Sequence, residues 1–234
     1  MADQLLDPVQ AFAELGRMKL GETDLAGVLA RIATLARRTV PNAEEVSVTL
    51  LPDTGPYTAA YTGDLALALD EGQYRDGSGP CLEAAAAGIT LWIPDLARED
   101  RWPRYVGRAL DDGVRGCLAV GFPVREAVAG ALNIYAGKPD AFDDDGVAVA
   151  RTFSGYAAVA LANAHLYDAT ATLAQHMQAA MVSRAVIEQA KGILMAERRC
   201  TADEAFATLS KLSQDSNRKL RDVASALVAR AARR

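Results

Sequence analysis

The chain has 234 residues, of which 50% are hydrophobic and 24% are charged, and it contains only three cysteines. This balance is typical of a globular protein with one or two domains, and it excludes a disordered, fibrous or disulfide-stabilised chain. The N-terminus is acidic where a secretory signal would be basic, and no apolar run reaches the roughly 18 residues of a membrane span. We therefore expect a cytoplasmic protein with no membrane partner.

The net charge of −5 is unevenly distributed along the chain. From Arg184 to Arg234 there are 11 basic and 6 acidic residues, a net charge of +5, whereas the residues before Arg184 carry −10. A basic segment of this kind suits a polyanionic partner, although a basic helix surface is equally common without one. Charge alone leaves both alternatives open.

The first predicted element is a helix over Asp24–Thr39, where apolar residues recur at three- and four-residue spacing. Helical stretches are also predicted at Pro80–Ala87 and Arg101–Asp112. Short β-branched or aromatic stretches predict five strands, at Glu45–Leu51, Tyr57–Thr62, Thr90–Ile93, Val114–Val124 and Val128–Ala136. Arg125-Glu126-Ala127 is expected to connect the last two strands as a hairpin. This order predicts an α+β domain in which helices flank a largely antiparallel sheet.

The stretch Val147–Met181 is predicted to be one long helix, because it lacks proline and consists almost wholly of helix-favouring residues. Its apolar residues alternate four and three apart, which is the spacing of a coiled-coil seam. Over Phe153–Leu161 we expect this stripe to pack on its own domain, and over Thr170–Met181 we expect a homodimer contact. Two competing seams stay open, and their candidate residues are Tyr167, Leu173, Met177 and Met181.

After Met181 the pattern predicts three short helices whose apolar faces can close one small core. The first spans Arg184–Arg198, and the second opens at Thr201 with a capping box. The third is expected to begin near Asn217 as its N-cap residue. Phe206 is the only aromatic residue after Tyr167, and we expect it to fill the core, with stacking on an RNA base as the alternative.

This tail carries characteristic residues in a fixed order and spacing, namely Arg184–Met195 (RAVIEQAKGILM), Asp203–Phe206, Leu209, Ser213, Asn217, Lys219–Leu220 and Val223–Ala224. They resemble the signature of the ANTAR family, and the resemblance covers about Met181–Ala232. It implies a three-helix bundle that binds paired RNA stem-loops in nascent transcripts, usually as a dimer, and prevents a terminator hairpin from forming.

The body of the chain carries four further motifs, at Gly77–Cys81 (GSGPC), Ile93–Asp95 (IPD), Gly113–Val120 (GVRGCLAV) and Gly130–Tyr135 (GALNIY). In that order they resemble a GAF sensory domain extending from Leu5 to about Tyr167. The resemblance implies the fold and leaves the ligand unidentified; no cofactor is evident and no metal site is expected. The candidate sensor-pocket residues are Cys81, Trp102, Tyr105 and Cys117, with plain core packing as the open alternative for each.

RNA loops are recognised through phosphates and unstacked bases, so a binding surface needs cations and small polar groups. Seven-residue spacing places Arg184, Lys191 and Arg198 in one stripe, and Lys219 with Arg221 adds charge nearby. Ser213 and Asn217 lie one turn apart as candidate base contacts, although Asn217 is equally a candidate helix cap. The alternative for the cations is a solvated basic face.

Together these patterns predict a GAF-like sensory domain over residues 5–167, a coiled-coil linker over 168–182 and an all-α ANTAR bundle over 183–232. The expected function is signal-responsive RNA binding that regulates transcription antitermination, without enzyme activity, in a homodimer with a small-molecule effector. The alternative is a small-molecule-binding or cysteine-dependent redox enzyme whose tail only dimerises. Nothing in the sequence places an activating histidine or lysine beside Cys81 or Cys117, which disfavours a reactive thiolate.

Overall fold

The computed structural model describes residues 5–19, 23–123 and 129–232, so the expected hairpin connection Arg125-Glu126-Ala127 lies outside the described residues. The chain divides into two compact units, Met1–Asp168 and Ala169–Arg234. One helix, α6 (Asp144–Arg198), contributes residues to both units.

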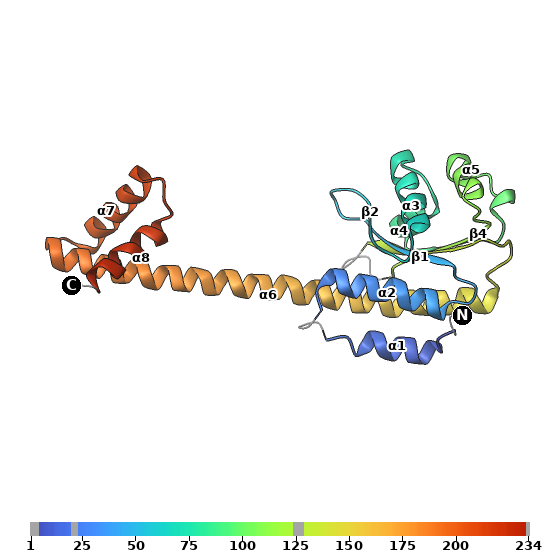
Figure 1. The fold of residues 1–234 in the computed structure, drawn as a ribbon, viewed down its shortest axis with the longest axis horizontal. Helices are drawn as coiled ribbons and strands as arrows, with labels where there is room; N and C mark the ends of the chain where they lie inside the picture. The colour runs from blue at the N-terminus through green and yellow to red at the C-terminus, as the bar shows by residue number, and fades with distance from the viewer. Residues whose placement is uncertain (1–4, 20–22, 124–128, 233–234) are drawn as a thin grey trace. The chain divides into compact units, whose positions relative to one another are not determined.

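The first unit is built on a five-stranded sheet with the strand order β2-β1-β5-β4-β3 (Figure 1). The strands are β1 (Glu45–Leu50), β2 (Tyr57–Tyr61), β3 (Thr90–Ile93), β4 (Gly116–Gly121) and β5 (Gly130–Ala136). Every neighbouring pair is antiparallel, which confirms the predicted α+β fold. The central strand β5 is hydrogen-bonded on both edges and is buried along its whole length.

The two faces of the sheet pack against different helices (Figure 1). Side chains alternate between the faces of a strand, so Val48, Leu118 and Ile134 enter an apolar core shared with α2 (Leu25–Thr39) and the beginning of α6. The opposite face, which includes Cys117 and Tyr135, enters a second core. Three helices cover that face, α3 (Asp64–Asp76), α4 (Pro80–Ala87) and α5 (Pro103–Asp111).

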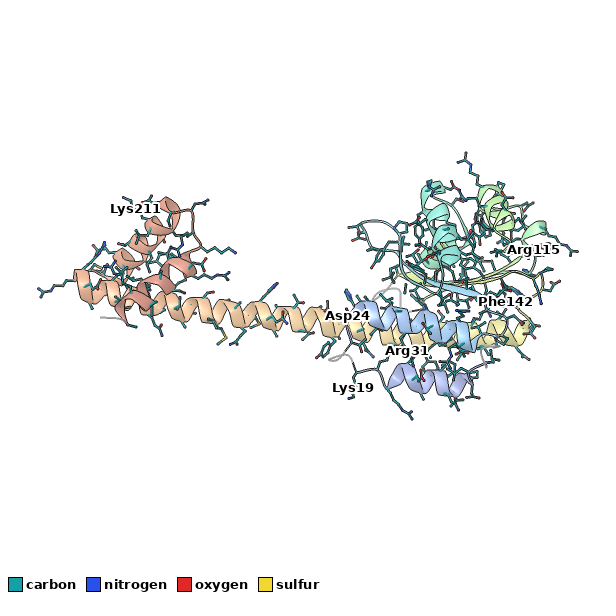
Figure 2. All side chains as sticks on the ribbon, viewed as in Figure 1. Lys19, Asp24, Arg31, Arg115, Phe142 and Lys211 are labelled. Carbon is teal, nitrogen blue, oxygen red and sulfur yellow. The ribbon has the colours of Figure 1, made fainter. Side chains whose placement is uncertain are left out.

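Two helices of the first unit were not expected from the sequence. The first is α1 (Pro8–Gly16), whose Phe12 ring stacks on Tyr156 of α6 with the ring centroids 4.5 Å apart. Its Glu14 also forms an ion pair with Arg31 of α2, the residue labelled in Figure 2. The second is α3, which starts at Gly63 without a capping side chain and contains Gly72, so its local helix signals are weak. Burial against the sheet stabilises α3 instead.

The long helix extends further than expected. It runs without a break for 55 residues from Asp144 to Arg198, so the prediction of a separate helix starting at Arg184 is wrong. The Ser183 hydroxyl donates to the Ala179 carbonyl (2.7 Å) within the continuing helix and does not cap a new one. The expected packing of Phe153–Leu161 on its own domain is confirmed by the burial of Phe153, Ala157 and Leu161. No described helix has both the length and the apolar character to cross a bilayer.

In the second unit, α7 (Ala202–Asp215) and α8 (Leu220–Ala231) pack with the end of α6. Their shared core consists of Ala190, Leu194, Ala205, Leu209 and Ala224. The expected capping box opens α7, because the Thr201 amide donates to the Glu204 carboxylate (2.8 Å) and the Glu204 amide donates to Thr201 Oγ1 (3.3 Å).

The prediction that Asn217 caps the start of α8 is wrong, because Lys219 occupies that position. Asn217 instead terminates α7 in a left-handed conformation with φ of +50°. The Asn217 amide donates to the Gln214 carbonyl (3.2 Å), and the Arg218 amide donates to the Ser213 carbonyl (3.1 Å). This pair of bonds is a Schellman closure, and asparagine is one of the few residues that tolerate the left-handed position it requires.

Candidate functional site

A cluster of polar side chains is buried between the sheet and α3. We call it the Asp70 cluster, and it comprises Ser47, Thr49, Thr58, Asp70, Tyr74, Asn133 and Tyr135. Strands β1, β2 and β5 and helix α3 supply its members. Polar groups buried in this way need hydrogen-bond partners, so the cluster is a constrained feature of the fold.

The Asp70 carboxylate is the centre of this cluster. One of its oxygens accepts hydrogen bonds from the Tyr135 hydroxyl (2.6 Å) and from the side-chain amide of Asn133 (3.3 Å). The other oxygen accepts from the Thr58 hydroxyl (2.9 Å), which also contacts the Tyr74 hydroxyl (2.9 Å). Hydroxyl and amide donors therefore surround a carboxylate that is closed off from solvent.

No described residue forms an ion pair with Asp70, although buried charges are normally paired. Burial consequently raises the pKa of Asp70 from 3.8 to about 6, an increase that the surrounding hydroxyl donors only partly offset. The carboxyl group changes charge close to neutral pH, and a strongly perturbed pKa inside a fold is a common mark of a functional site.

All four expected sensor-pocket residues are buried, and Trp102, Tyr105 and Cys117 belong to the same apolar core as Tyr135. Tyr105 of α5 and Cys117 of β4 are brought close enough to affect each other's ionisation. Trp102 and Tyr105 line a hollow of about 220 Å³ at the surface, together with Asp76, Ser78, Pro103 and Arg104. Cys81 lies at the start of α4, where its amide donates to the Gln73 side chain (2.9 Å).

Two polar atoms in this region have no hydrogen-bond partner among the described residues. They are the Tyr105 hydroxyl and the Asn133 side-chain oxygen. Although Tyr105 lies beside Cys117, its hydroxyl makes no hydrogen bond of normal geometry with that thiol. Unpaired buried polar atoms are rare in folded proteins, so these two could accept hydrogen bonds from a small polar molecule.

The buried thiols are poorly suited to nucleophilic chemistry. Burial raises the pKa of Cys117 to about 12 and raises the pKa of Cys81 well above its usual range. A reactive cysteine needs a thiolate, and thiolate formation needs a lowered pKa. These two side chains are therefore protonated thiols at neutral pH. Within the described residues, no cluster of three or more His, Cys, Asp or Glu side chains could hold a metal ion.

Sequence reasoning missed Asp70 and its partners, although part of the signal was present. Ser47 and Thr49 alternate on β1, and Asn133 and Tyr135 alternate on β5, so period-two spacing places each pair on one face. An asparagine inside an otherwise apolar strand is a further signal. Asp70 itself could not have been identified, because its helix was not expected.

The expected RNA-binding cations lie on the second unit. Arg184 and Arg198 are exposed on α6, Lys219 is exposed immediately before α8, and none of the three forms an ion pair with a described residue. Arg221 is also exposed but lies 3.6 Å from the Asp222 carboxylate.

Lys191 does not belong to a freely solvated face. Its side chain is only 17% exposed and its ammonium group lies 3.0 Å from Glu188. Lys191 lies one helical turn from Ile187 and Leu194, which pack in the core of the bundle, and a lysine stem can pack on apolar surface while its head group reaches a partner. Any contact of Lys191 with RNA would compete with Glu188.

Ser213 and Asn217 lie where α7 ends. The Ser213 hydroxyl donates to the Arg218 carbonyl, so its proton is already used within the turn. The Asn217 side chain is exposed and makes no hydrogen bond with a described residue. Phe206, expected in the core, is 45% exposed on α7, because the small core is closed by aliphatic residues. The expectation for Phe206 is therefore wrong.

Comparisons with known structures extend these findings. The chain is similar to the GAF domain of an Acinetobacter phosphoenolpyruvate-protein phosphotransferase, with 13% identity over 68% of this chain and 92% of that one and a TM-score of 0.53. It is also similar to a free methionine-R-sulfoxide reductase from Neisseria meningitidis, solved with its substrate, with 15% identity over 68% and 89% of the two chains and a TM-score of 0.53. The chromophore-binding domain of a bacteriophytochrome from R. palustris shares 10% identity over 68% and 61% of the two chains, with a TM-score of 0.53. Identities this low show the fold alone.

Family models divide the chain in the same order as its motifs. A model described as the GAF domain matches residues 22–162, and a model described as the ANTAR domain matches residues 175–228. A search of curated protein sequences finds no match. Because the first match spans more than half of the 234 residues, the chain belongs to the GAF domain family and carries a C-terminal ANTAR domain.

Proposed function

We propose that this chain is a cytoplasmic, signal-responsive RNA-binding regulator of transcription antitermination. The observation that carries the proposal is the ANTAR match over residues 175–228, on a helical unit in which the exposed cations Arg184, Arg198 and Lys219 form no ion pair with a described residue. Phosphate contacts supply most of the affinity of a protein for nucleic acid, and they need cations that are free to pair. The expected target is a stem-loop in a nascent transcript.

The RNA-binding residues fall into two groups in this proposal. Arg184, Arg198 and Lys219 contact phosphates directly, and Lys191 and Arg221 do so after leaving Glu188 and Asp222. Ser213 and Asn217 contact base edges, with the Ser213 oxygen as acceptor because its proton is already donated.

The signal enters through the GAF domain. Its effector is a small polar molecule that reaches the face covered by α3, α4 and α5, where Tyr105 and Asn133 have unpaired atoms. In this proposal the buried side chains of Cys81, Trp102 and Cys117 also line the effector site. Trp102 already lines the surface hollow together with Tyr105. A ligand shifts a protein between two conformations only if it binds one of them more tightly than the other. In this proposal the two conformations differ in the packing around Asp70.

A second copy of the chain completes the regulator. Leu173, Met177 and Met181 lie within one narrow stripe of α6 and are exposed by 59%, 59% and 66%, with Tyr167 on its flank at 49%. Contiguous exposed apolar side chains on a helix are unfavourable in water and are typical of a helix–helix contact. We therefore assign the homodimer seam to this stripe.

Crosslinking the full chain to RNA in cells and measuring its affinity for the recovered stem-loops tests the proposal. The affinity should fall with salt, and Lys219→Ala should weaken binding and reduce the salt slope by about 0.7 to 0.9. Lys211→Ala is the matched control, because Lys211, labelled in Figure 2, is an exposed cation on α7 that helical spacing turns about 160° away from Ser213 around the helix. Binding no tighter than to unstructured RNA, or equal effects of both variants, would refute the proposal.

A further inference from the structure

Phe206 is a half-exposed aromatic side chain that lies outside the core of the bundle. It is the only aromatic residue within residues 175–228, yet it is absent from the core of the second unit and 45% exposed. Aliphatic side chains on α6, α7 and α8 close that core without it. An exposed phenylalanine is therefore available for a partner.

Helical spacing aligns Phe206 with small polar residues. Ser210 and Ser213 follow it by four and seven residues, so all three lie along one stripe of α7, and Asn217 follows at the end of the helix. We call these four residues the Phe206 stripe. An aromatic ring beside hydroxyl and amide groups is the combination that binds an unpaired base, since the ring stacks and the polar groups reach the base edge.

The surroundings of the stripe favour RNA over an apolar partner. The other exposed large apolar residue of α7, Leu212, lies six residues further on and about 120° away around the helix, so it does not enlarge the surface of Phe206. Arg218 and Lys219 directly follow Asn217, are exposed and form no ion pair with a described residue. A single ring flanked by polar groups and two cations complements a base with its phosphates.

We propose that Phe206 is a stacking platform for an unpaired loop base, and that the Phe206 stripe is the base-reading surface of this protein. The proposal rests on the proposed RNA-binding function and adds the mode of recognition. Stacking accepts any base, so specificity comes from Ser210, the Ser213 oxygen and the Asn217 amide. The free Asn217 amide can both donate and accept, which suits the edge of a purine.

Variants of the full chain, tested on a stem-loop RNA recovered by crosslinking, measure the contribution of the ring. Phe206→Ala should weaken binding by about 5- to 150-fold, the range found when one stacked base loses its aromatic partner. Phe206→Tyr should retain binding, and Phe206→Leu should lose it although its side chain remains apolar. Leu212→Ala is the matched control, because Leu212 has the same 45% exposure on the same helix, and it should bind normally.

Two further readouts separate stacking from other roles. The salt slope should be unchanged in Phe206→Ala, since no phosphate contact is lost. Removing loop bases one at a time from the RNA should reveal one position whose loss weakens wild-type binding but has no further effect on Phe206→Ala. Circular dichroism should show that the variant remains folded, as expected for a residue outside the core.

Other outcomes would overturn the inference in distinguishable ways. If wild type binds the stem-loop and Phe206→Ala binds equally well, the stacking role is wrong while the proposed function stands. If Phe206→Leu retains wild-type affinity, the ring is dispensable. If Phe206→Ala dissociates the dimer in sedimentation, a second copy covers this residue. If wild type binds no stem-loop, the proposed function itself fails.

Discussion

Replacing Asp70 with asparagine should remove the part of the pH dependence of GAF-domain stability that comes from the Asp70 carboxyl group. The folded state holds the Asp70 proton more tightly than the unfolded state, because burial raises the pKa from 3.8 to about 6. The stability that this proton contributes is fully present below pH 3.8 and is lost as the pH rises through 6. At 1.36 kcal/mol per pKa unit the full effect is about 3 kcal/mol.

The measurement is denaturant unfolding of wild type and Asp70→Asn at several pH values between 4 and 7.5. Both tryptophans of the chain, Trp92 and Trp102, lie in the GAF domain, so tryptophan fluorescence reports on this domain alone. The free energy of unfolding of wild type should fall by about 2 to 3 kcal/mol across this range relative to that of the variant.

Other groups do not obscure the comparison. The pKa of Asp95 is lowered by a hydrogen bond from the Ala97 backbone amide, and the pKa of Glu99 is lowered by a hydrogen bond from Arg101. Both carboxylates therefore increase the stability of the folded domain as the pH rises. Both are unchanged in the variant, so the difference between the two proteins isolates Asp70. Parallel pH profiles for wild type and Asp70→Asn would refute the reasoning, because Asp70 would then ionise normally in the folded domain.

Three other variants have direct consequences. Leu173→Glu combined with Met177→Glu should shift sedimentation towards the monomer, since charges cannot be buried in an apolar seam; a coefficient equal to that of wild type with an intact fold would contradict the seam. Cys117→Ser should leave RNA affinity within about twofold of wild type in binding titrations, and loss of RNA binding by a folded variant would argue for thiol chemistry. Thr201→Ala should destabilise the bundle by about 1 kcal/mol in thermal unfolding followed by circular dichroism, and no change would show that the capping box is energetically idle.

Local patterns were enough to predict the elements whose signals lie within themselves. The helix Pro80–Ala87 starts at a proline and ends at a glycine, and its predicted range agrees with the structure. The strand Thr90–Ile93 agrees in the same way. By contrast, α3 has no capping side chain and depends on burial against the sheet, which a single sequence does not display.

For the candidate sites too, the sequence predicted what depends on local spacing and missed what depends on contacts between elements. Spacing identified the cations of the tail, but it could not show that the Lys191 side chain is largely buried and pairs with Glu188. Asn217 was recognised as a capping residue at the wrong end, because a left-handed closure and an N-cap use the same residue type. The Asp70 cluster joins four separate elements, so only the fold brings it together.

The central claim is that this chain regulates transcription antitermination. Its most direct test is single-round transcription in vitro on a template that encodes, upstream of a terminator, the stem-loops recovered by crosslinking in cells. We expect the full chain to increase the fraction of transcripts that read through the terminator. Arg184→Ala combined with Lys219→Ala should abolish the increase, because two phosphate contacts are removed. Termination that is unchanged by the wild-type chain at concentrations that saturate the RNA would contradict the account.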